Sequence, residues 1–135
     1  MTVTQERLGD SAPIDSVIVG GDVELPFACR HVDGTGDREV VIKARAIQCA
    51  LSRICAVCGT GLGRPVAFVG TAANADDRYF LFPPAHEQCA TDLARTVPAA
   101  VVVTTAGFDL VRPARRGDPA AFRPNSVLSR TSPWV

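Results

Sequence analysis

The feature that most constrains the fold of this chain is a set of three cysteines and one histidine. Cys55 and Cys58 form a Cys-x2-Cys pair, and His86 and Cys89 follow further along as His-x2-Cys. Three thiolates and one imidazole make a complete tetrahedral ligand set for zinc. Because the protein itself fills all four positions, no position stays open for water or substrate. The pattern therefore predicts one structural Zn2+ per chain.

The residues around these ligands suit metal coordination. Gly59 directly follows the second cysteine, so the backbone can fold under the sulfur and aim its N–H groups at it. His86 and Cys89 stand at the start of a predicted helix, where positions three apart share one face. The positive end of the helix dipole favours thiolates there. Iron in a rubredoxin-like role is the alternative, but a histidine in the set favours zinc.

The segments that flank the ligands predict an α+β domain. A stripe of apolar residues at helical spacing indicates an amphipathic helix over 38–54, formed by Val40, Ala44, Ile47, Leu51 and Ile54. Residues 65–70 and 78–82 are expected to form a β-hairpin across a polar loop. A helix follows, with Pro83 and Pro84 in its first turn and Pro98 at its end. Residues 100–105 and 108–112 predict a second hairpin.

The chain has in order a tight turn that carries Cys55 and Cys58 (the knuckle), a predicted β-hairpin and a predicted helix, and this order resembles the treble-clef zinc finger. Cys55 and Cys58 match its knuckle pair, and His86 and Cys89 its helical pair, over residues 54–97. The same stretch is similar to small, poorly characterised zinc proteins of GC-rich bacteria and their phages, a resemblance that implies no activity. Treble clefs also include HNH nucleases, which need a catalytic histidine on the hairpin. Residues 65–70 and 78–82 contain none, so that class is excluded.

The length of 135 residues is typical of one small domain. Residues 1–15 are expected to be a flexible lead-in. Residues 16–112 are expected to form a single zinc-binding domain, with a strand over 23–29 that Pro26 places at an edge. Residues 113–135 are rich in proline and arginine and are expected to form a tail with little regular structure.

Charge and hydropathy argue against several classes of partner and of targeting segment. The formal net charge is zero, so nothing global indicates nucleic acid or an anionic membrane as partner. The tail is mildly basic, and Arg112, Arg115, Arg116 and Arg123 are candidates to contact nucleic-acid phosphates. No apolar run suits a membrane span or a secretory signal. Cysteines used for metal rather than disulfides fit a cytoplasmic location, and no membrane partner is expected.

Cys29, His31 and Cys49 remain outside the zinc set. They could form a second metal site or supply a nucleophile and a base, but buried cysteines explain them more simply. The leading hypothesis is a non-enzymatic, zinc-stabilised module that binds another macromolecule, with a protein as the expected partner in an adaptor or accessory role. One alternative is nucleic-acid binding through the arginines of the tail. The other is an enzyme, or a small enzyme subunit, that uses Cys29, His31 or Cys49.

Overall fold

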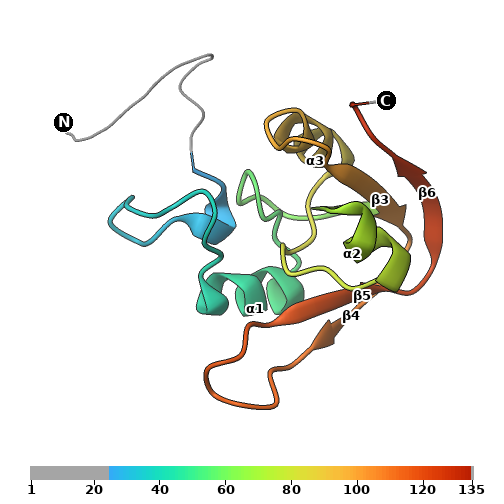
Figure 1. Cartoon of the computed structure of the whole chain (residues 1–135). Coiled ribbons are helices and arrows are strands. Elements are labelled where there is room, and N and C mark those ends of the chain that lie inside the picture. Colours follow the sequence, from blue (N-terminus) through green and yellow to red (C-terminus); the bar gives the residue numbers. More distant parts are fainter. Residues whose placement is uncertain (1–24, 135) are drawn as a thin grey trace.

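The computed structural model describes residues 25–134 and shows an α+β fold (Figure 1). Its elements are the 3-10 helix η1 (Phe27–Cys29), α1 (Lys43–Ser52), β2 (Val66–Gly70), α2 (Ala72–Asp77), α3 (Glu87–Ala94), β3 (Val101–Thr105), β4 (Phe108–Val111), β5 (Ala121–Pro124) and β6 (Val127–Thr131). The expectations for residues 1–15 and for the start of the 23–29 strand lie outside the described residues. The rest of that predicted strand is wrong, because residues 27–29 form η1.

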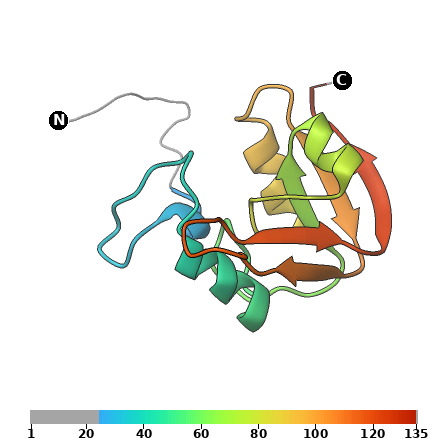
Figure 2. The same ribbon diagram turned by 60° about the horizontal axis from the view of Figure 1, so that its bottom comes forward.

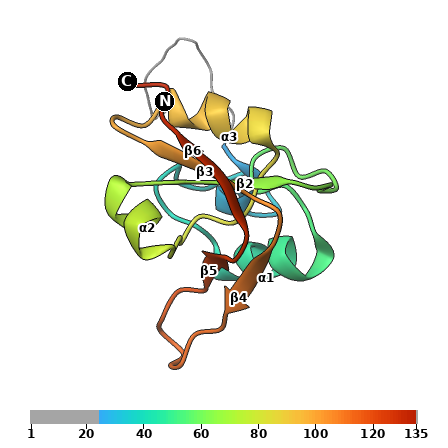
Figure 3. The same cartoon turned by 90° about the vertical axis from the view of Figure 1, so that its right-hand side faces the viewer.

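Two antiparallel sheets organise the fold. One has the strand order β2-β3-β6, and the other pairs β4 with β5. The central strand β3 is buried along its whole length, as expected for a run of β-branched residues between two neighbours. Figure 3 shows α3 across one face of the larger sheet, where its Ala90 and Ala94 pack against Ala67 and Val102.

The two sheets are joined by one long, bent β-ribbon. β3 and β4 form one side, β5 and β6 the other, and two backbone hydrogen bonds bridge the bend, from Ala106 to Ser126 and from Asn125 to Gly107. The register of the β3–β6 pairing shifts between Thr104 and Thr105. The Thr105 hydroxyl accepts hydrogen bonds from the N–H groups of Gly107 and Ser126, which stabilises the bend at this point. The predicted hairpin of 100–105 with 108–112 is therefore wrong, because Ala106-Gly107 is a bend within one side of the ribbon.

Four phenylalanines form the centre of the core. Phe68 of β2 stacks on Phe80 at 5.3 Å between ring centroids and meets Phe108 edge-on at 5.7 Å. Phe122 of β5 lies 6.0 Å from Phe68 and is fully buried. The expectation of little regular structure beyond Pro113 is therefore wrong, since β5 supplies a central core residue and β6 completes the larger sheet. Figure 2 shows α1 beside the β4–β5 pair.

The hairpin predicted from residues 65–70 and 78–82 does not form. β2 is a strand as expected, but it pairs with β3. Residues 72–77 form α2, because the Thr71 hydroxyl accepts from the Asn74 N–H and the Asn74 side chain accepts from the Thr71 N–H. The other edge of β2 is bridged by Ala85, which exchanges two backbone hydrogen bonds with Ala67.

The helix predicted over 38–54 is shorter than expected. It starts at Lys43, since the Ile42 N–H donates to the Ala28 carbonyl outside the helix, and it ends at Ser52. Its buried residues are Ala46 and Cys49, whereas Val40 is 54% exposed and Leu51 is 62% exposed. The predicted apolar stripe is therefore wrong.

Candidate metal centre

The structure brings Cys55, Cys58, His86 and Cys89 together. One ligand atom from each residue lies within 4.8 Å of all the others. Zinc–sulfur bonds of about 2.3 Å in a tetrahedron place two sulfurs about 3.8 Å apart, so the four atoms need only a small contraction around an ion. Among residues 25–134 no second group of three or more potential ligands is found. The four residues could therefore hold one metal ion.

Cys55 lies at the buried side of this centre and is surrounded by backbone donors. The N–H groups of Val57, Cys58 and His86 point at its sulfur at 3.4, 3.5 and 3.4 Å. Its side chain is fully buried. Backbone N–H groups that converge on the sulfur supply outer hydrogen bonds of the kind that metal-bound groups usually have. This environment fits a metal-bound cysteine.

His86 is oriented by its second ring nitrogen. Nδ1 faces the sulfurs of Cys58 at 3.4 Å and Cys89 at 3.8 Å. Nε2 lies 2.9 Å from the Gly61 carbonyl oxygen. A carbonyl can only accept, so Nε2 carries the proton and donates it, which leaves a lone pair on Nδ1. Histidine ligands of metals usually make such a bond with their other nitrogen, which fixes both tautomer and ring orientation.

The two remaining thiols, Cys58 and Cys89, have pKa values shifted in opposite directions. Burial alone would raise the pKa of Cys58, but hydrogen bonds, chiefly those with the side chain and backbone of Thr60, outweigh it and lower that pKa to about 6. Burial, together with the negative charge of Cys55 and Cys58, raises the pKa of Cys89 to about 12. Three thiolates at this distance repel one another unless a cation is present. A divalent ion would remove that repulsion and deprotonate Cys89.

The knuckle that carries Cys55 and Cys58 is held on two sides. Residues 54 and 61 form an isolated antiparallel bridge, and the Gly59 N–H closes the turn onto the Cys55 carbonyl at 2.9 Å. Gly59 has φ of +78°, and a Cβ there would lie 2.9 Å from the Phe27 ring. Ala56 donates to the Pro84 carbonyl and accepts from the Ala28 N–H. The knuckle is thus tied to the segment before α1 and to the segment before α3.

α3 carries the other two candidate ligands at its start, with two differences from the predicted helix. His86 is the N-cap of α3 and Cys89 lies in its first turn. Pro83 and Pro84 were expected in the first turn of this helix, but they precede it. They are fully buried and directly precede Ala85, which forms an isolated β-bridge with Ala67 of β2.

Sequence reasoning missed two residues that support the ligands. Thr60 places its hydroxyl 3.1 Å from the Cys58 sulfur, and Gly61 supplies the carbonyl partner of His86. Thr60 and Gly61 directly follow the Cys-x2-Cys-Gly run, so their nearness in sequence was the available signal. The carbonyl contact itself depends on the fold and has no residue-type signature.

Cys29, Cys49 and His31 do not gather into a cluster of this kind. Cys29 is buried, and its thiol lies 3.7 Å from the Arg38 carbonyl, to which it donates. Cys49 is fully buried beside Ala28 and Ala56, and burial, with the negative charge of Cys55, raises its pKa to about 12. His31 is exposed.

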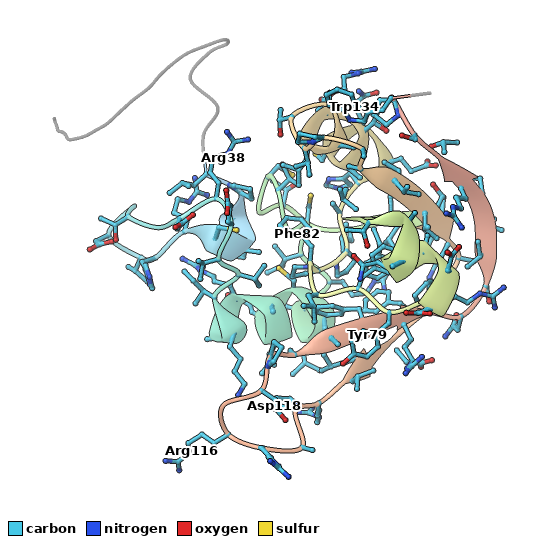
Figure 4. The ribbon with its side chains drawn as sticks, in the orientation of Figure 1. Arg38, Tyr79, Phe82, Arg116, Asp118 and Trp134 are labelled. Atoms are coloured by element: carbon cyan, nitrogen blue, oxygen red, sulfur yellow. The ribbon has the colours of Figure 1, made fainter. Side chains whose placement is uncertain are left out.

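The candidate phosphate-contacting arginines gather around the β4–β5 pair. Arg112, Arg115 and Arg116 are exposed, after β4 and in the loop that leads to β5, and Arg123 lies on β5 over the Tyr79 ring at 5.0 Å. Figure 4 shows Arg116 at the end of that loop, away from the core. Asp109 and Asp118 lie in the same region. The surface is therefore arginine-rich but not uniformly positive.

Comparisons of the chain with known protein families, with curated proteins and with solved structures give no match. Among residues 25–134, no helix has the length and apolar character needed to cross a membrane.

Proposed function

We propose that this chain is a zinc-stabilised module that binds another macromolecule, with a protein as its main partner. One Zn2+ is held by Cys55, Cys58, His86 and Cys89 and has a structural role. The observation that carries this proposal is the convergence of four ligand atoms within 4.8 Å. A site closed by four protein ligands holds elements together and leaves no position for a reacting molecule.

We further propose that the zinc module is a variant of the treble clef. The knuckle, the strand β2 with its bridge to Ala85, and α3 with two ligands at its start follow the order of that finger. The variant differs in its hairpin, whose second arm is reduced to Ala85 after an excursion through α2.

Metal analysis of the purified protein tests the zinc assignment. We expect one zinc per chain, and we expect a chelator to reduce the circular dichroism of the folded protein, because binding and folding of such sites are coupled. His86→Ala should lose the metal, whereas Gln88→Ala, an exposed neighbour on α3, should keep it. Equal zinc content in both variants, or unchanged circular dichroism after chelation, contradicts a structural zinc site.

Exposed apolar side chains support a protein partner. Val40 and Leu81 are 54% and 45% exposed and border a shallow groove together with Pro119. Apolar groups grouped on a surface commonly mark a protein interface. A partner captured in stoichiometric amount by cross-linking should be lost from Leu81→Asp and retained by Leu128→Asp, at an apolar site on β6 that is 60% exposed. Loss of the partner from neither variant, or from both, excludes this groove.

A second candidate function is nucleic-acid binding, which the exposed arginines of the β4–β5 region favour. Affinity for DNA or RNA should then fall steeply with rising salt, because phosphate contacts release counterions. Substitution of both Arg115 and Arg116 by Gln should weaken binding and flatten the salt dependence. No detectable binding at low salt excludes this function.

A further inference from the structure

A second cavity lies apart from the metal centre. It has a volume of about 350 Å³, is partly open to solvent, and is lined by the end of β2, the start of α2, α3 with the residues after it, and the segment around Pro26. None of the four metal ligands lines it. Its size falls in the lower part of the range for small-molecule sites, roughly 300–1,000 Å³.

The walls of this cavity are almost wholly apolar. Val69, Phe82, Leu93 and Val97 contribute the larger apolar side chains, and most of the other described lining residues are prolines and alanines, with Thr71 as the one hydroxyl among them. Leu93 follows Cys89 by one helical turn, so α3 carries a metal ligand on its first turn and a cavity wall on its second. Such walls disfavour ligands with many polar groups, since of these described residues only Arg38 and Thr71 offer side-chain polar atoms to replace the lost hydration.

Arg38 is the single charged side chain among the described residues that line the cavity. Its guanidinium donates to the Thr96 hydroxyl at 3.1 Å, which fixes it near the end of α3. Figure 4 shows Arg38 on the segment that precedes α1, with Phe82 nearer the centre of the molecule. A guanidinium carries five N–H donors in a planar fork, so it can hold Thr96 and a carboxylate together.

An apolar interior with one cation at its border matches a ligand with an apolar body and one carboxylate. We propose that this cavity binds an unbranched aliphatic carboxylic acid of medium length, with its carboxylate on Arg38 and its chain between Phe82 and Leu93. At about 30 Å³ per water-sized group, the volume accommodates roughly eight to twelve carbons. This site shares no residue with the candidate metal centre.

A series of acids tests the proposed length. Titration calorimetry of the full chain with hexanoate, octanoate, decanoate and tetradecanoate should show affinity rising roughly fourfold per added methylene until the cavity is full. The rise should stop near ten to twelve carbons. Absence of saturable decanoate binding, or a rise that continues unchanged to tetradecanoate, overturns the proposal.

A matched pair of variants tests the place of binding. Ala72 lines the cavity and Ala73 does not, although both are exposed in the first turn of α2. Ala72→Leu should fill part of the cavity and reduce decanoate affinity at least tenfold, whereas Ala73→Leu should bind like the wild type. Equal affinities in the two variants overturn the assignment to this cavity. Circular dichroism shows whether each variant is folded.

A second pair tests the role of Arg38. Arg38→Gln should reduce decanoate affinity roughly fivefold to tenfold and leave decanol affinity unchanged, because only the acid pairs with the guanidinium. Arg95→Gln removes an exposed arginine outside the cavity and should change neither ligand. Decanol binding as tight as decanoate binding, or equal effects of Arg38→Gln on both, overturns carboxylate recognition.

Discussion

Replacement of Phe122 by alanine tests whether β5 belongs to the folding core. Its ring is fully buried and lies 6.0 Å from Phe68 and 6.3 Å from Phe108. Truncation of a buried phenylalanine costs about 3–5 kcal/mol, because the transfer free energy is lost and a cavity remains. The whole domain is expected to have about 5–15 kcal/mol of stability. The single substitution should therefore remove a large fraction of the free energy of unfolding.

Urea denaturation followed by circular dichroism at fixed free zinc measures this effect. With a slope of about 1–3 kcal/mol per molar urea, the midpoint should fall by roughly 2 M. Leu128→Ala, on the exposed strand β6 of the same ribbon, should change stability by less than about 0.5 kcal/mol. If Phe122→Ala does not fold at all, Phe122→Leu supplies an intermediate loss. A loss below about 1 kcal/mol in Phe122→Ala would refute the role assigned to β5.

Three further predictions concern other parts of the structure. Gly59→Ala should weaken zinc binding and cost about 1–3 kcal/mol, because φ is +78° and the new Cβ meets Phe27 at 2.9 Å, whereas Gly63→Ala, with open space around it, should have little effect in the same titrations. Thr71→Ala removes the capping box of α2 and should cost about 1 kcal/mol in thermal unfolding, and Thr131→Ala, exposed on β6, serves as the control. Cys29 and Cys49 should alkylate slowly in the folded protein, since burial raises the pKa of both thiols, and fast alkylation of either would favour the enzymatic alternative. The raised pKa values also predict that the free energy of unfolding falls as pH rises above 9, because the thiols lose their protons more readily in the unfolded chain.

The cluster of Cys55, Cys58, His86 and Cys89 could be predicted from the sequence because its signal is local. Two short spacings and a glycine indicate a knuckle and a helix start, and the structure brings those four residues together. The strand β2 and the burial of β3 could also be predicted, because β-branched residues are dense in both.

The elements that could not be predicted depend on contacts distant in sequence. β5 is short and contains Pro124, so its pattern is weak. It is stabilised by contacts distant in sequence: its pairing with β4, the two backbone hydrogen bonds between Phe80 and Phe122, and the contact of Phe122 with Phe68. The helix α2 differs, because its signal is local: Thr71 is followed three residues later by Asn74. The segment is short and lies between two apolar runs, a pattern that favours a β-hairpin.

The backbone of the knuckle has a consequence for how the protein opens. Ala56 bonds to both Ala28 and Pro84, and Phe27 donates to the Val57 carbonyl at 3.1 Å. Segments far apart in sequence therefore meet at one short stretch beside the metal ligands. Amide hydrogens of Phe27, Ala28 and Ala56 should exchange with solvent as a single cooperative unit, whose opening rate follows metal occupancy. Release of the ion would then loosen the segment at Pro26, which forms one wall of the apolar cavity.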